Sequence, residues 1–108
     1  MDIEAAVEEF GGDRGFILGL TGEFISTARK QLQDIEQGLE NGNFDAAKSN
    51  AHSIKGGSAN LTANDLSQAA MMLEQAAKGS DREQSYEAFG KLKSELERLS
   101  AFFITIQQ

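Results

Sequence analysis

Apolar side chains recur at every third or fourth position along most of the chain, which is the spacing of an amphipathic helix. The longest such run lies between Asp13 and Asn41-Gly42, and it carries Phe16, Ile17, Leu20, Phe24, Ala28, Leu32, Ile35 and Leu39. A second long run follows Ser80, with Phe89, Leu92, Leu96, Leu99, Phe103 and Ile106 at alternating spacings of three and four. This alternation is typical of a bundle seam, so the two runs predict two long helices.

Two shorter periodic segments lie between the long ones. The first carries Ala47, Ala51, Ile54, Ser58 and Leu61, and the second carries Leu66, Ala69, Ala70, Leu73 and Ala77. A further short run, Ile3, Ala6, Val7 and Phe10, precedes the first long helix and is stopped by Gly11-Gly12. The pattern therefore predicts four main helices and a short helix ahead of them.

Short polar side chains stand before each run, where they can cap the first turn of a helix. We expect caps at Asp2, Asp13 and Asn43, and capping boxes formed by Thr62 with Asp65 and by Ser80 with Glu83. The breaks between the main runs are turns of two to four residues, which force neighbouring helices to be antiparallel. We therefore predict an all-α fold, an up-down antiparallel four-helix bundle with a short N-terminal helix, in a single domain over residues 1–108.

Composition and charge narrow the function classes. The 108 residues include no proline or cysteine and one histidine, so we expect no disulfide, no thiolate site and no metal site. A net charge of −7 repels phosphate backbones and anionic lipids, so we expect no nucleic acid and no direct membrane contact. No leader-like segment or long apolar run is present, and we expect a cytoplasmic monomer.

The one histidine lies in a helix that also contains the unusual pair Gly56-Gly57. Because the apolar period continues through the glycines, we expect this helix to be unbroken to about residue 60. At about 100° per residue, His52 points roughly 140° away from the core position Ala47 and should be exposed. The positions on the same stripe are Lys48, Lys55, Gly56 and Ala59.

This stripe suits a nucleophile that carries a phosphoryl group. An exposed imidazole is mostly neutral at pH 7 and keeps a free lone pair. Lys55 can pair with phosphoryl oxygens, and Gly56 removes the side chain that would obstruct a partner. Two plainer interpretations stay open at this point, namely that the stripe is an ordinary solvated face and that the glycines serve close packing.

The segment Ala51-His52-Ser53-Ile54-Lys55-Gly56 resembles the histidine-containing phosphotransfer (HPt) domains. The resemblance extends to Ser58, Asn60-Leu61, Ala63, Leu66-Ser67, Ala70 and Leu73-Glu74, and to Gly12-Asp13 and the Gly-Asn-Phe-Asp turn at 42–45. Its core, His-x-x-Lys-Gly on the second main helix of a four-helix bundle, is fairly specific. The resemblance covers most of the chain.

The resemblance implies a phosphorelay carrier that moves a phosphoryl group between receiver-domain aspartates, downstream of a sensor histidine kinase. It implies that His52 is the phosphoacceptor, that Lys55 steadies the phosphoryl oxygens and that Gly56 admits the receiver. We expect receiver docking around Lys48, Ser49, Gly57 and Ala59. No cofactor is expected on this chain, since Mg²⁺ belongs to the receiver, and the lack of a nucleotide-binding loop argues against autonomous ATP-dependent kinase activity.

Two positions need structural information. Thr62 stands where the family commonly has glycine, ten residues after the histidine, so the turn there should differ slightly. Glu74 either reaches the imidazole Nδ1 of His52 and orients it, or is a surface glutamate paired with Lys78. A glutamate at this spacing also resembles the phosphoacceptor domain of chemotaxis-type histidine kinases, which is an alternative function, and a non-catalytic helical adaptor is an alternative from a different class.

Overall fold

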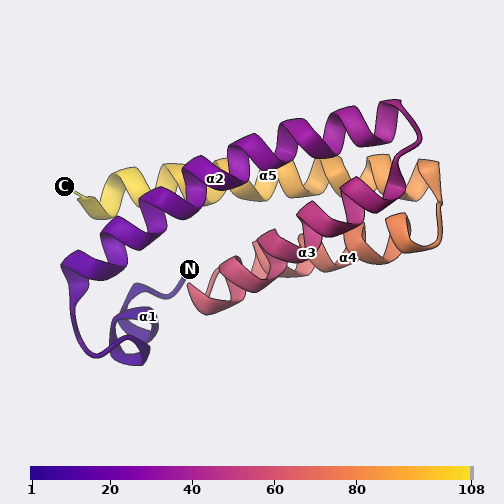
Figure 1. The fold of residues 1–108 in the computed structure, drawn as a ribbon. Coiled ribbons are helices and arrows are strands. Elements are labelled where there is room, and N and C mark those ends of the chain that lie inside the picture. Colours follow the sequence, from indigo (N-terminus) through magenta and orange to yellow (C-terminus); the bar gives the residue numbers. More distant parts are fainter. Residues whose placement is uncertain (108) are drawn as a thin grey trace.

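The computed structural model describes residues 1–107, which form five helices and no strand (Figure 1). The helices are α1 (Ile3–Glu9), α2 (Arg14–Glu40), α3 (Phe44–Asn60), α4 (Asn64–Lys78) and α5 (Arg82–Gln107). The predicted all-α class is confirmed, and α3 runs unbroken through the two glycines as expected. Within the described residues, none of the helices is both long and apolar enough to cross a membrane.

The four main helices form an antiparallel bundle. Helix α2 packs against α3 and α5, and α4 packs against the same two helices, so the four close into a ring. In Figure 1, α2 and α5 run beside each other in the upper part of the view, and α3 and α4 run together below them. The short α1 lies outside the ring at the end where α2 begins. The bundle is elongated, with extents of 42 × 21 × 16 Å.

The core is built from the positions that the apolar pattern selects. The largest buried hydrophobic side chains are Ile17, Ile35, Leu39, Ile54, Leu61, Leu66, Leu73, Leu92 and Leu96. Phe16 is the exception, because its side chain is 52% exposed. It lies in the first turn of α2, where its ring meets Phe10 at 6.1 Å in a tilted pair instead of entering the bundle. Phe16 therefore keeps the helical spacing of the apolar run without entering the core.

Three of the predicted helix caps are confirmed. The side-chain oxygens of Asp2, Asp13 and Asn43 accept hydrogen bonds from the backbone N–H groups three residues later, at 3.1, 2.9 and 3.1 Å. Each bond satisfies an N–H group that has no partner within its helix. These caps fix where α1, α2 and α3 begin. The cap at Asn43 sets the first turn of α3 and thereby the position of His52 along that helix.

The two predicted capping boxes are wrong, for a common physical reason. Thr62 and Ser80 both adopt positive φ, at 58° and 52°, and this left-handed conformation is not that of a cap residue. The cap position therefore moves one residue along the chain. Ala63 caps α4 without a side-chain bond, and the Asp81 carboxylate accepts the N–H of Gln84 at 3.0 Å before α5.

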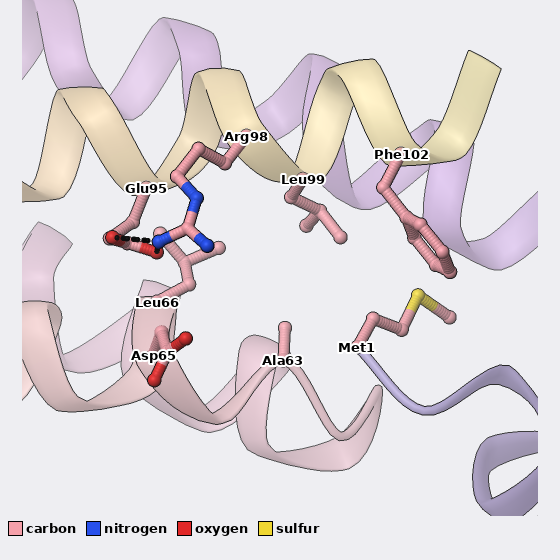
Figure 2. A pocket seen from close by; sticks show the side chains of 8 residues that line it. All are labelled: Met1, Ala63, Asp65, Leu66, Glu95, Arg98, Leu99 and Phe102. Atoms are coloured by element: carbon pink, nitrogen blue, oxygen red, sulfur yellow. Dashed lines mark hydrogen bonds and ion pairs between the residues drawn. The ribbon is translucent and has the colours of Figure 1, made fainter. Parts of the chain in front are cut away.

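The Thr62 hydroxyl instead holds the N-terminal segment. It accepts a hydrogen bond from the Asp2 backbone N–H at 2.7 Å and donates one to the Asp2 carbonyl at 2.8 Å. The adjoining Met1 side chain lies beneath the Phe102 ring, in a crevice between the start of α4 and the end of α5 (Figure 2). Polar and apolar contacts thus hold the N-terminal segment against the end of the bundle where α4 begins and α5 ends.

The turn between α2 and α3 depends on a glycine. A Cβ atom on Gly38 would lie 2.9 Å from the Asn43 carbonyl oxygen, which is backbone and cannot rotate away. We predict that Gly38→Ala destabilises the fold by about 1–3 kcal/mol, whereas Gly90→Ala, at an open helical site, stabilises it by roughly 0.5–1 kcal/mol. Urea unfolding of both variants measures the effect, and a gain in stability for Gly38→Ala would contradict this account of the turn.

Candidate functional site

Helix α3 continues through Gly56-Gly57, and two serine hydroxyls bond to its backbone beside the glycines. Ser58 donates to the Ile54 carbonyl at 2.6 Å and to the Lys55 carbonyl at 3.1 Å. Ser67 of α4 donates to the same Lys55 carbonyl at 3.2 Å. The bond from Ser67 ties α4 to α3 directly beside the glycines, so the position of Lys55 is fixed from outside its own helix.

His52 projects from α3 toward solvent, with 67% of its side chain exposed. Its Nδ1 atom lies 2.7 Å from Oε2 of Glu74 on the neighbouring helix α4. Because an ionised carboxylate only accepts hydrogen bonds, Nδ1 carries the proton in this contact. In the neutral ring the other nitrogen, Nε2, then keeps the lone pair that a nucleophilic imidazole uses.

The same carboxylate also holds Lys55. The Lys55 ammonium donates to Oε1 of Glu74 at 2.7 Å, so the two oxygens serve two different residues of α3. The Glu74 side chain is only 20% exposed, and that of Lys55 is 32% exposed. Glu74 therefore lies beside His52, as one interpretation of the sequence expected, and its lysine partner is Lys55 rather than Lys78.

The charge state of Glu74 follows from these contacts. The hydrogen bond from Lys55 lowers the pKa of Glu74 below its ordinary value of 4.5. Partial burial opposes that shift, while the hydrogen bond to His52 and the positive charge of Lys55 reinforce it. Glu74 is consequently ionised at neutral pH and can keep accepting the Nδ1 proton of His52.

The two adjacent glycines have different surroundings. A Cβ atom on Gly56 would meet no atom within 4 Å, so the surface one turn from His52 is open. A Cβ atom on Gly57 would lie 2.6 Å from a ring carbon of Phe24 in α2. Gly57 thus serves close packing between α2 and α3, whereas Gly56 leaves a gap on the outer surface.

The remaining predicted docking residues surround His52 on the outer side of α3. Ser49 and Ala59 are exposed, and Lys48 is half-buried. Sequence reasoning did not identify the contact that links this face to α2, a hydrogen bond of 2.9 Å from the Gln31 amide to the Ser53 hydroxyl. It also gave Ser67 no role at the site, although this residue stands seven positions before Glu74 and so shares its helix face.

Taken together, these side chains can support nucleophilic group transfer. His52 supplies an exposed nitrogen lone pair, Glu74 holds the proton on the opposite ring nitrogen, and Lys55 supplies a positive charge within the same cluster. The electrophile has to arrive from outside, and the open surface at Gly56 gives a bulky partner room to approach.

Comparison with known proteins indicates the family and the fold. The family model described as "Hpt domain" matches residues 19–102, the part of the chain that contains the main bundle. The crystal structure of histidine-containing phosphotransfer protein B (HptB) from Pseudomonas aeruginosa PAO1 has a similar fold, with a TM-score of 0.86. That likeness covers 98% of this chain and 90% of HptB at 22% sequence identity. No curated protein matches the sequence.

The lowered pKa of Glu74 predicts a pH-dependent contribution to stability. Folded protein binds fewer protons at this group than unfolded protein does, so its contribution is present above pH 4.5 and is lost as the pH falls below that value. We expect Glu74→Gln to lower the free energy of unfolding by about 1 kcal/mol at pH 7 and by less in acid.

Urea unfolding at several pH values measures this difference. Glu87→Gln, at an exposed glutamate of α5, is the matched control and should change stability little at any pH. A loss for Glu74→Gln that is the same at pH 7 and in acid would show that the charge of Glu74 contributes nothing.

Proposed function

The chain belongs to the Hpt domain family, and on that premise we propose that it is a phosphorelay phosphocarrier whose phosphoacceptor is His52. Family membership gives a histidine phosphotransfer role. The assignment to His52 rests on one observation above all: the only histidine of the sequence is exposed, and its Nδ1 is held by Glu74 so that Nε2 faces outward as a nucleophile.

In the proposed transfer, Nε2 of His52 attacks the phosphorus of a receiver-domain aspartyl phosphate. The N–P bond forms, the P–O bond to the aspartate breaks, and the electron pair of that bond returns to the aspartate carboxylate. The Nδ1 proton stays in its hydrogen bond to Glu74, and Lys55 balances the charge on the phosphoryl oxygens. Transfer to a second receiver reverses these steps.

Access to His52 favours a large partner over a small substrate. The nucleophile lies on a helix surface, one turn from the open site at Gly56, and is not enclosed. A receiver can therefore bring its own Mg²⁺ and aspartyl phosphate to the ring, with Ser49 and Ala59 at the contact edge. Lys48 and Gly57 border this region, and Gly57 contributes by letting Phe24 pack beneath it.

The proposed partners are response-regulator receivers, supplied with phosphoryl groups by a sensor histidine kinase. The protein would act as a cytoplasmic monomer without its own ATP-dependent kinase activity, since the sequence contains no nucleotide-binding loop. The net charge of −7 weighs against nucleic acid as a partner.

The contact between Glu74 and His52 favours a second candidate function. A glutamate at this spacing resembles the acceptor domain of chemotaxis-type kinases, which a separate ATP-binding domain phosphorylates. Labelling by such a domain with ATP, and none by phosphorylated receivers, would select this alternative. A purely structural adaptor, in contrast, would carry no acid-labile phosphate from either donor.

The phosphoacceptor assignment predicts the result of a labelling experiment. Incubation with receivers phosphorylated on aspartate should transfer an acid-labile phosphate to this protein, and His52→Gln should abolish the transfer without unfolding the bundle, because His52 is exposed. A phosphate-affinity gel shift measures the phosphorylation, and circular dichroism measures whether the bundle stays folded. Labelling that persists in His52→Gln would rule His52 out as the acceptor.

The access role of Gly56 can be separated from effects on folding. Gly56→Ala adds a methyl group where the structure is open, so it should not destabilise the helix. We expect it to slow transfer from a phosphorylated receiver by roughly tenfold, equivalent to about 1.4 kcal/mol, because the methyl group meets the partner. Labelling by phosphoramidate, a small donor, should be unchanged.

Gly90→Ala is the matched control, since Gly90 is also an open helical glycine but lies on α5. It should leave both labelling reactions at the wild-type rate. Equal rates of receiver transfer for Gly56→Ala and Gly90→Ala would remove the access role from Gly56.

A further inference from the structure

We infer that Glu74 is a positioning residue from which Lys55 must separate when His52 carries a phosphoryl group, so that Glu74 limits how strongly Lys55 holds phosphohistidine. The inference rests on the proposed function and adds a regulatory element to it. Its basis is that the lysine expected to steady the phosphoryl group is engaged elsewhere in the unphosphorylated protein.

The engagement of Lys55 is specific. Its ammonium lies 2.7 Å from Oε1 of Glu74, while Oε2 of the same carboxylate lies 2.7 Å from Nδ1 of His52. One carboxylate thus links the nucleophile to the cation. With Glu74 at 20% exposure and Lys55 at 32%, the contact between these two side chains is partly shielded from water, which strengthens their electrostatic attraction relative to a pair on an open surface.

Phosphorylation changes the charges within this cluster. The form of His52 that attacks is the neutral ring, so before transfer the carboxylate of Glu74 and the ammonium of Lys55 balance each other. Transfer to Nε2 while Nδ1 keeps its proton gives a cationic ring bearing a dianionic phosphoryl group. The cluster then holds two anionic groups, Glu74 and the phosphoryl group, and both attract the Lys55 ammonium.

The geometry indicates how this competition resolves. The hydrogen bond between Glu74 and His52 persists and becomes stronger, because Nδ1–H now belongs to a cation and the bond is charge-assisted. Lys55 is the group that can move, since its flexible stem carries a compact charge toward the phosphoryl oxygens. Separating Lys55 from Glu74 costs free energy, and this cost weakens the net interaction between Lys55 and the phosphoryl group.

Removing the charge of Glu74 should consequently prolong the life of phosphohistidine. Lys55 can then hold the phosphoryl group without competition from Glu74. The ring also loses the carboxylate that favours its cationic form, and a cationic ring leaves the phosphorus more readily than a neutral one. Loss of Lys55 should shorten the lifetime, and it should shorten it more when Glu74 no longer competes.

A double-mutant cycle tests this coupling on the whole protein. Wild type, Glu74→Gln, Lys55→Met and the double variant are labelled with phosphoramidate, and the decay of phosphohistidine is followed by phosphorus-31 nuclear magnetic resonance. We expect Lys55→Met to accelerate decay in both backgrounds. The acceleration should be about threefold greater, or more, in the Glu74→Gln background than in wild type. Glu87→Gln serves as the control and should leave the decay rate unchanged.

The outcomes separate this inference from the proposed function. Additive effects on the decay rate would overturn the competition between Glu74 and the phosphoryl group, even if receivers label His52 normally. Failure of every phosphorylated receiver and kinase to label His52 would instead overturn the phosphocarrier role. A merely structural role for Glu74 changes the free energy of unfolding but leaves the effect of Lys55→Met on decay the same in both backgrounds.

Discussion

The close approach of α3 and α4 is the constraint on which the candidate site depends. Both helices bury small side chains in the core, namely Ala47 and Ala51 in α3 and Ala69, Ala70 and Ala77 in α4. Small residues at a helix contact allow short interaxial distances. Across this contact the Glu74 carboxylate reaches both His52 and Lys55, and the Ser67 hydroxyl reaches the α3 backbone.

Much of the fold could be predicted from local sequence. The apolar period gave the helices, and the caps at Asp13 and Asn43 follow from side chains that bond only within their own turn. The capping boxes at Thr62 and Ser80 failed because the pattern does not encode which residue of a turn takes positive φ. At Thr62 that choice is stabilised by two hydrogen bonds to Asp2, sixty positions away, which no local pattern contains.

The candidate site shows the same division. Helical phase alone placed His52 on the exposed face, because phase depends only on the register of α3. The lysine partner of Glu74 was not predictable, since Lys78 satisfies the i+4 rule within α4 while Lys55 becomes a neighbour only through the packing of two helices. Helical phase also placed Gly56 on the stripe of His52, but the packing of Gly57 against the Phe24 ring depends on the contact between α2 and α3 and was not predictable.

Openness at a glycine does not by itself indicate function. Gly19 and Gly90 are also helical and also have no atom within 4 Å of an added Cβ, so helices of this protein tolerate such positions elsewhere. Each such glycine costs roughly 1 kcal/mol relative to alanine. What distinguishes Gly56 is its position four residues from an exposed imidazole whose proton is already held by a carboxylate. A side chain there would meet a bulky partner that approaches Nε2, and this geometric relation, rather than the glycine alone, connects Gly56 to the proposed chemistry.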